Sequence, residues 1–181
     1  MTIETKKKIL EAAERRVRKS GFAEMSFRDL AADVGIKSAS VHYHFPTKPD
    51  LGEALVDLYA KQFKQKLDKI ALNNLNTALS EFVRLYDEAL VLQESICLCA
   101  IMGAEAMGLP ETINQRTKAF FNMNRVWLET LLTNNSVKNA KGKASMVVAA
   151  LEGGMIVASA SNDRSIFNQI SQIAIECATS K

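Results

Sequence analysis

The most restrictive feature of this sequence is a series of closely spaced helix-start and helix-stop signals between residues 26 and 50. Ser26 opens a capping box of the S-x-x-D form, whose hydroxyl and carboxylate can satisfy the first backbone N–H groups of a helix. Gly35 can end that helix after about two turns, and Ser38 is predicted to cap a third helix. A second box over residues 47–50 starts a long fourth helix.

An amphipathic helix is predicted directly before this segment. Ile9, Ala13 and Val17 recur at helical spacing over roughly residues 3–19, with lysine and arginine on the other face. Gly21 can end this helix in the left-handed conformation. An amphipathic helix followed by two short helices around a glycine turn is the outline of a helix-turn-helix domain.

Long helices are predicted for the rest of the chain. Only 8 Gly and 3 Pro occur in 181 residues, and no segment alternates in hydrophobicity as a strand does. The fourth helix is expected to run to about residue 70, and later helices are predicted over residues 75–94, 96–107, 111–134, 138–160 and 163–179. The predicted fold class is all-α, with a three-helix N-terminal helix-turn-helix headpiece and a C-terminal helical bundle.

Positive charge is concentrated in the first 48 residues. This part has ten Lys and Arg against six acidic residues, whereas residues 49–181 have thirteen against fourteen. A basic head on a nearly neutral body fits a polyanion partner for the head alone. A solvated basic surface would produce the same modest excess, so charge by itself leaves both interpretations open.

The residue types that enzymes and metal sites need are poorly represented. The three cysteines form no C-x-x-C pair or disulfide framework, and both histidines lie in the head, so we expect no metal and no cofactor. There is no glycine-rich phosphate loop and no Ser/His/Asp constellation, which argues against an enzyme. The N-terminus has no apolar core of a signal peptide, and residues 144–161 suit a buried helix of small residues, so a cytoplasmic protein is expected.

The predicted third helix, over residues 38–45, has two different faces. At about 100° per residue, Val41 and Phe45 share a face that must pack on the other helices. Ala39, Ser40 and Tyr43 then point the opposite way. Small side chains let a helix approach base edges closely, where a serine can donate or accept and an alanine methyl can contact a thymine methyl.

Further residues could reach the DNA backbone from the same surface. His42 and His44 flank the exposed face, and Lys48 adds a charge at the start of the fourth helix. Taken singly, each of these residues fits an ordinary partly exposed surface as well. Together, on a capped helix after a glycine turn, they favour major-groove binding.

The stretch from Ser26 to Leu51 resembles the DNA-binding signature of the TetR/AcrR family of bacterial repressors, within a match over roughly residues 5–60. The resemblance implies a homodimer whose two headpieces enter successive major grooves, ligand binding in the C-terminal domain, and release from a palindromic operator on ligand binding. It divides the chain into a DNA-binding domain at residues 1–48, with the start of a linking helix over 48–70, and a ligand-binding and dimerisation domain at residues 49–181.

The resemblance also implies roles for single residues. Ser26 and Arg28 stand at positions that contact phosphate in the family. The positions that face the groove in the family are occupied here by Lys37, Ser38, Ala39, Ser40 and Tyr43. His44 and Lys48 stand at positions that contact the DNA backbone in the family. The family usually has an aromatic residue where this sequence has His42, which puts a phosphate contact there in doubt and could instead make DNA binding mildly pH-dependent.

The second half matches the family by pattern only. Residues 149–154 resemble a penultimate helix that forms the dimer bundle with the last helix, although a core helix within one subunit would look alike. Helical bundles need aromatic and Met residues for packing, so the sequence distinguishes residues that line a ligand pocket only weakly from ordinary core residues. The candidates for the ligand site are Tyr86, Cys97, Met102, Phe121, Asn124, Trp127 and Glu152.

The leading hypothesis is therefore a DNA-binding regulator, released from its operator by a small molecule of unknown identity. One alternative is a thiol-based sensor of oxidants or electrophiles using Cys97 or Cys99, which lie two apart and so point in different directions on a helix. Small buried core residues explain these cysteines more simply, since few charges that would lower a thiol pKa lie nearby. Another alternative is an architectural protein that binds DNA without regulating transcription.

Overall fold

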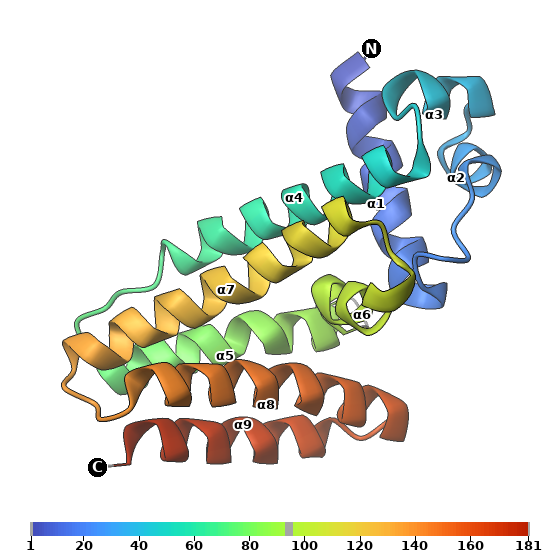
Figure 1. Cartoon of the computed structure of the whole chain (residues 1–181). Helices are drawn as coiled ribbons and strands as arrows, with labels where there is room; N and C mark the ends of the chain where they lie inside the picture. Colours follow the sequence, from blue (N-terminus) through green and yellow to red (C-terminus); the bar gives the residue numbers. More distant parts are fainter. Residues whose placement is uncertain (1, 93–95, 181) are drawn as a thin grey trace. The chain divides into compact units, whose positions relative to one another are not determined.

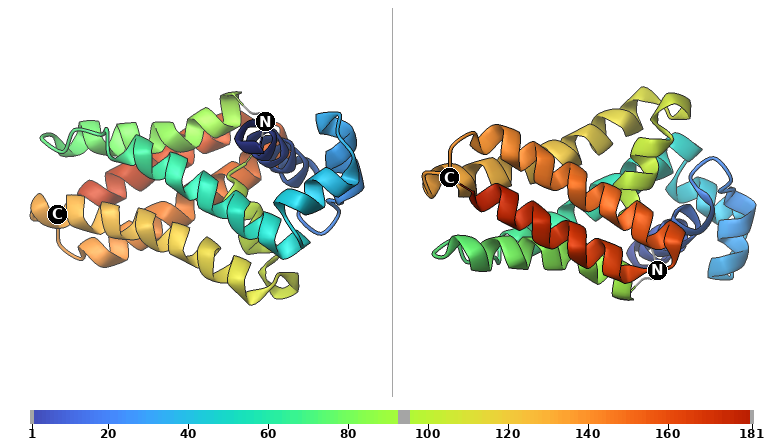
Figure 2. Two further views of the ribbon diagram at one scale, coloured as in Figure 1. Left: turned by 90° about the horizontal axis from the view of Figure 1, so that it is seen from above. Right: turned by 90° about the horizontal axis from the view of Figure 1, so that it is seen from below.

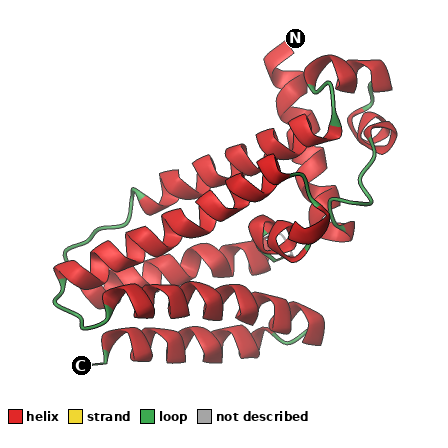
Figure 3. Cartoon of the chain, in the orientation of Figure 1, coloured by secondary structure: helices red, strands yellow, loops and turns green. Residues whose placement is uncertain are grey.

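The computed structural model describes residues 2–92 and 96–180, and these form helices joined by turns, with no strand among them (Figures 1 and 3). The helices of the first half are α1 (Thr2–Ser20), α2 (Phe27–Val34), α3 (Ser38–His44), α4 (Lys48–Leu67) and α5 (Leu75–Leu92). Those of the second half are α6 (Leu98–Ala104), the 3₁₀ helix η1 (Ala106–Gly108), α7 (Glu111–Asn134), α8 (Ala140–Ser161) and α9 (Arg164–Thr179). The all-α fold class is confirmed.

The chain divides into two compact units. The head unit contains the residues up to Lys61 together with Leu98–Lys118, and the bundle unit contains Gln62–Cys97 and the residues from Ala119 onward. The head unit thus includes α6 and η1 as well as the three N-terminal helices. The division into domains at residue 48 stays a prediction, because the compact units are interleaved along the sequence.

The core of the head unit lies between α1, α2 and α3. Ile9 and Val17 of α1, Leu30 of α2 and Val41 of α3 have no exposed surface, and α1 packs on α2 and α6 while α2 packs on α3. Gly21 and Gly35 both have positive φ, at 84° and 72°. Residues with a Cβ rarely adopt this conformation, which explains why glycine follows both helices and confirms the predicted stops.

Two of the three predicted caps need correction, and one is confirmed. At the start of α4, the Thr47 N–H donates to Asp50 Oδ2 (2.9 Å) and the Asp50 N–H donates to Thr47 Oγ1 (3.3 Å), which is the predicted box. At α2, Ser26 Oγ accepts from the Asp29 N–H as predicted, but the Asp29 carboxylate accepts from the Ser26 hydroxyl and not from its backbone.

The prediction that Ser38 caps α3 is wrong. The capping position is Lys37, in an extended conformation and without a side-chain cap, and Ser38 is already helical. The Ser40 N–H donates to the Lys37 carbonyl at 2.8 Å. Because the helix begins at Ser38 itself, the capping position falls one residue before the side chain suited to it.

The bundle unit is built around the antiparallel pair α8 and α9, which lie side by side in orange and red (Figure 2). Gly154 makes this approach possible, because a Cβ there would lie 3.2 Å from Ile170 Cγ2 and 3.4 Å from Phe167 Cδ2 of α9. By length and composition α8 could cross a membrane, but 44% of its apolar window is buried inside the protein. This agrees with the predicted buried helix of small residues.

Two predicted helices differ from the structure in where they end. α4 ends at Leu67 instead of near residue 70, and the helix predicted over 96–107 is split into α6 and η1. The split occurs at Glu105, whose carboxylate accepts hydrogen bonds from the backbone N–H groups of residues 22 and 23. α5 reaches Leu92, and the last residues of its predicted range lie outside the described part of the chain.

Candidate nucleic-acid interface and ligand site

The two faces of α3 are disposed as the sequence predicts. Val41 is 0% exposed and Phe45, directly after the helix, is 2% exposed. On the opposite face Ala39 is exposed, Ser40 is half-buried, and Tyr43 is 75% exposed. An aromatic side chain this exposed contributes little to folding, so its place on a small, rigid helix suits an interaction with another molecule.

A shallow groove of about 420 Å³ runs along this exposed face. Its lining is Thr5, Ile36, Lys37, Ala39, Ser40, Tyr43 and His44. Five of these belong to the predicted DNA-contacting set. Thr5, from α1, was missed, because helical periodicity assigns it only to the polar face of α1 and says nothing of which helix lies beside it.

The N-terminal lysines differ in what surrounds them. Lys7 and Lys8 pair along the helix with Glu11 and Glu4 at the surface. Lys6 instead places its ammonium 5.3 Å from the centre of the Phe45 ring, at the end of α3. Lys6 is a further candidate for a phosphate contact that was missed, although the run of three lysines is a signal for it.

The histidines and Ser26 are held by contacts within the head unit. The His42 ring meets the Phe27 ring edge-on at 4.7 Å, with Nδ1 3.4 Å from the Pro46 carbonyl oxygen. The His44 ring lies 5.3 Å from the Tyr43 ring. The Ser26 hydroxyl is engaged by Asp29, while Arg28 is exposed. DNA contacts by these residues stay predictions.

Lys48 is tied to the turn between α1 and α2. Its ammonium donates to the Ala23 carbonyl oxygen at 2.7 Å and lies 5.0 Å from the centre of the Phe22 ring, and burial lowers the pKa of Lys48. From the other side, the Glu105 carboxylate accepts the N–H groups of Phe22 (3.0 Å) and Ala23 (3.2 Å). Lys48 therefore joins the start of α4 to the turn between α1 and α2. Glu105 is a structural residue that sequence reasoning missed.

A cluster of aromatic side chains fills the interior of the bundle unit. Phe82 stacks on Trp127 at 5.3 Å with only 13° between the ring planes, and it lies 5.4 Å from Tyr86. Phe63 continues the cluster to Tyr86 at 5.5 Å and to Phe120 at 5.2 Å. Two of the predicted ligand residues, Tyr86 and Trp127, are members. A third, Phe121, is at its edge, 5.6 Å from Phe120.

Asn124 brings an amide into this apolar interior. It is 0% exposed, and helical spacing places it on the same face of α7 as Phe120 and Trp127. Its Nδ2 donates to the Phe120 carbonyl oxygen at 3.0 Å. Its Oδ1 is buried without a hydrogen bond among the described residues. A buried acceptor without a donor is costly unless another molecule supplies one.

Glu152 and Cys97, both predicted ligand residues, come together in the bundle unit. Glu152 on α8 is 8% exposed, and neither carboxyl oxygen has a hydrogen bond of good geometry among the described residues. Burial, and after it the neighbouring Cys97 thiol, raise the pKa of Glu152 well above its ordinary value. The remaining candidate, Met102, is fully buried in α6 and belongs to the head unit, as does Cys99.

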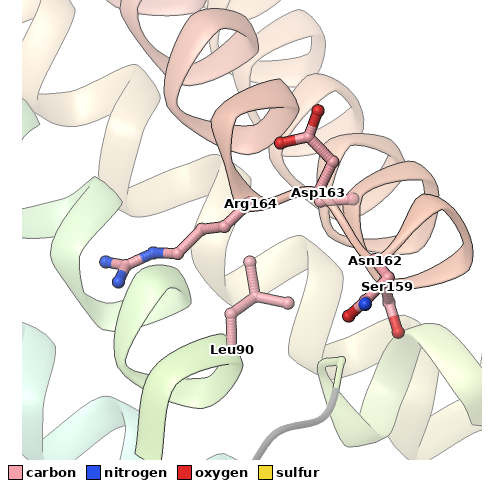
Figure 4. Close-up of a pocket in the computed structure, with 6 residues that line it drawn as sticks. Leu90, Ser159, Asn162, Asp163 and Arg164 are labelled. Carbon is pink, nitrogen blue, oxygen red and sulfur yellow. The ribbon is translucent and has the colours of Figure 1, made fainter.

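The turn between α8 and α9 has a second hollow, of about 510 Å³ (Figure 4). Leu90 of α5 and Arg164 of α9 line it with Ala158, Ser159, Asn162 and Asp163. Its charged groups already have partners, since Arg164 binds Asp87 and the Asp163 carboxylate accepts the Ser165 N–H at 2.9 Å. None of the predicted ligand-site residues lines this hollow.

Comparison with known proteins gives consistent matches over both halves of the chain. Residues 9–55 match the family model for bacterial regulatory proteins of the tetR family, and residues 76–173 match the C-terminal domain of LmrA/YxaF-like transcriptional regulators. The HTH-type transcriptional regulator TtgR of Pseudomonas putida is 39% identical over 54 residues, which is 30% of this chain and only 26% of that protein. The chain thus matches about a quarter of that relative's length.

Solved structures resemble nearly the whole chain. A TetR transcriptional regulator from Legionella pneumophila is 27% identical with a TM-score of 0.88, over 94% of this chain and 95% of that one. A TetR-family regulator from Agrobacterium tumefaciens is 25% identical with a TM-score of 0.93, over 99% and 100%.

Proposed function

This chain belongs to the tetR family of bacterial regulatory proteins, and from this premise we propose that it is a repressor released from its operator by a small molecule. Family membership makes it a DNA-binding transcriptional regulator and not an enzyme. Repression, ligand release, a palindromic operator and a homodimer are the finer parts of the proposal. A protein that acts on bacterial DNA in this way works in the cytoplasm.

The observation that carries the DNA-binding part is the orientation of α3. Burial of Val41 and Phe45 fixes the helix, so that Ala39, Ser40 and Tyr43 are presented together. In the proposed complex the first two approach base edges in the major groove, and Tyr43 binds a phosphate. We assign further backbone contacts to Ser26, Arg28, Lys37, Ser38, His42, His44 and Lys48.

The outer faces of α8 and α9 support the proposed homodimer. Ile156 and Val157 on α8 are 43% and 47% exposed, and Ile173 on α9 is 58% exposed. Exposed apolar side chains of this size on two packed helices favour an isologous interface with a second copy. A two-fold dimer would place two α3 helices on half-sites about 34–36 Å apart, which calls for a palindromic operator.

The bundle unit supplies the proposed effector site. Its interior combines aromatic rings with buried polar atoms that lack partners, on Asn124 and Glu152. A ligand that binds better to one of two arrangements of the head would shift the population toward it and thereby release DNA. The thiol-sensor alternative fits less well, because Cys97 and Cys99 are buried and Cys97 lies beside an acid, where a reactive thiolate needs a cation.

The direct test is binding of the full-length protein to the DNA upstream of its own gene, measured by gel shift or fluorescence anisotropy over a range of salt concentrations. A specific regulator binds this DNA at least about a thousandfold more tightly than unrelated DNA, with affinity falling steeply as salt rises. Affinity that is indifferent to sequence and to salt would refute the proposal. Light scattering in the same buffers reports whether the protein is a dimer.

A further inference from the structure

The exposed face of α3 is continued by the first turns of α1. The groove of about 420 Å³ along this face is lined by Thr5 of α1 as well as by residues of α3 and of the turn before it, and Figure 1 shows this end of α1 next to α3. Ile36 and Ala39 give the groove apolar side chains, and Lys37 and Tyr43 give it hydrogen-bond donors. None of the described residues that line it is acidic. Such a surface suits a sugar–phosphate chain, in which apolar sugar carbons alternate with anionic phosphates.

The ammonium group of Lys6 lies where α1 meets the end of α3. Its Nζ is 5.3 Å from the centre of the Phe45 ring, and Phe45 directly follows α3. Because Phe45 is only 2% exposed, its ring is held in the core of the head unit and gives the ammonium a fixed base. The Lys6 side chain itself is exposed, so its N–H donors are accessible to an anion. Lys6 thus adds a positive charge at the end of the helix where Tyr43 and His44 line the groove.

The two lysines that follow differ from Lys6 in direction and in pairing. At about 100° per residue, Lys8 points about 200° away from Lys6 and hence away from α3. Its ammonium lies 3.2 Å from Glu4 Oε1, and that of Lys7 lies 3.7 Å from Glu11 Oε1. Lys6 has no carboxylate partner among the described residues and contacts the Phe45 ring instead. The charge that α1 presents beside α3 is therefore not offset by an acid.

We propose that the first two turns of α1 belong to the DNA interface, and that Lys6 binds a phosphate of the DNA backbone beside the end of α3. The major groove is about 12 Å wide, and a helix with its side chains is about 10–12 Å across. When α3 occupies the groove, a side chain anchored against the end of α3 therefore lies close to the phosphates that border it. This inference rests on the proposed function, because it requires α3 to enter the groove.

The role of Lys6 is to position α3 and not to read bases. Phosphate contacts fix the register of a protein on DNA but carry no direct sequence information. Because the Phe45 ring links Lys6 to the end of α3, a phosphate bound by Lys6 fixes where Ala39 and Ser40 meet the base edges. We therefore expect the loss of Lys6 to weaken binding to every DNA sequence by a similar factor.

Salt titration of the full-length protein, with DNA binding measured by fluorescence anisotropy, tests the proposal. Each phosphate contact contributes about 0.9 to the steepness with which log affinity falls with log salt concentration. We expect Lys6→Gln to reduce this steepness by about 0.9 for each subunit bound, and to lower affinity at 0.1 M salt by at least about fivefold on the upstream DNA and on unrelated DNA. Lys6→Arg keeps the charge and should bind as the wild type does.

The matched control is Lys8→Gln, which removes the same charge two residues away on the other side of α1. It should keep the wild-type salt dependence. Circular dichroism and thermal melting confirm that each variant is folded. Ethylation interference gives an independent reading, because it shows which phosphates of the upstream DNA the protein needs. At least one phosphate needed by the wild type and by Lys8→Gln should no longer be needed by Lys6→Gln.

Several results would overturn the proposal. These are an unchanged salt dependence or an unchanged set of needed phosphates in Lys6→Gln, equal losses in Lys6→Gln and Lys8→Gln, and a loss confined to the upstream DNA. A loss that comes with a lower melting temperature and that Lys6→Arg does not restore does so too, because it shows a structural role of the contact with Phe45. If the wild type still prefers the upstream DNA when these tests fail, only the inference on α1 fails. A wild type that does not distinguish the upstream DNA from unrelated DNA would refute the proposed function, and this inference with it.

Discussion

The helices α2 and α4 have their first backbone N–H groups capped by side chains three residues away, whereas the interior of the bundle unit contains buried acceptors without good hydrogen bonds. Ser26, Thr47 and Asp50 are satisfied across single helix turns. Asn124 Oδ1 and the Glu152 oxygens, in contrast, are buried and lack good hydrogen bonds. The capped helix starts of the first region therefore need no further partner, whereas the buried acceptors of the second would be stabilised by any bound molecule that donates hydrogen bonds to them.

This difference matches the division of labour in the proposed function. A surface that reads DNA works best when it is rigid before the encounter, because no ordering has to accompany binding. A sensor works by having two arrangements close in free energy, and a ligand that satisfies buried groups in one arrangement shifts the population toward it. The predictions below test whether the two regions differ in this way.

The largest expected effect is on the aromatic interior of the bundle unit. Phe82→Ala removes a fully buried ring that stacks on Trp127, and we expect it to lower the free energy of unfolding by about 3–5 kcal/mol, measured by urea denaturation. Phe121→Ala, at the half-buried edge of the same cluster, should cost clearly less. Equal losses would mean that the cluster is not the core of this unit.

The next effect separates two glycines of similar conformation. Gly21→Ala and Gly35→Ala both force a Cβ into a positive φ, which costs about 1 kcal/mol. At Gly35 nothing lies within 4 Å of the new Cβ, but at Gly21 it runs into the Glu105 carboxylate. We expect Gly21→Ala to cost about 2–3 kcal/mol in all, because Glu105 loses its bonds to the backbone of residues 22 and 23.

Thermal or urea unfolding of the two glycine variants measures this difference. Glu105→Ala in the background of Gly21→Ala should add little further loss, because the contact is already broken. If the two alanine variants are equally stable, the carboxylate does not hold the turn between α1 and α2 in solution.

Sequence patterns predicted features that depend on nearby residues better than features that depend on distant ones, for a physical reason. The caps and glycine stops of α1, α2 and α4 depend on neighbours within a few residues, so they could be inferred locally. The capping residue of α3 is Lys37 and not Ser38. This depends on the path of the backbone after Gly35, which the capping preferences of side chains do not predict. The break after α6 depends on a partner 83 residues away in the sequence, at Phe22.

The candidate sites follow the same pattern. The inward and outward residues of α3 came directly from helical geometry, because one face of a short helix must be buried. Glu152 and Cys97 were both candidates, but their meeting depends on tertiary packing, which spacing cannot reveal. Met102 was grouped with them by composition alone, although it belongs to the other compact unit.

A third prediction concerns the pH dependence of stability. Burial raises the pKa of Glu152 above its ordinary value of 4.5, so the folded state binds this proton more tightly than the unfolded chain. The stabilisation is complete below the ordinary pKa and is lost as pH rises toward the folded-state pKa, by at most about 1.4 kcal/mol per pH unit. Urea denaturation from pH 5 upward should show the wild type losing stability relative to Glu152→Gln. Parallel curves would mean that the acid is not buried in solution.

The smallest expected effect on stability is in the head, and it is paired with a large effect on DNA. Because Tyr43 is 75% exposed, Tyr43→Ala should change the free energy of unfolding by no more than about 0.5 kcal/mol. If Tyr43 contacts the operator, the same variant should weaken binding to the upstream DNA by about tenfold, measured by fluorescence anisotropy. Val41→Ala, on the buried face, is the matched control, with a loss of stability of about 1–3 kcal/mol. A Tyr43→Ala variant that loses stability, or that binds the operator as the wild type does, would remove the distinction between a structural and a DNA-reading face on which the repressor proposal depends.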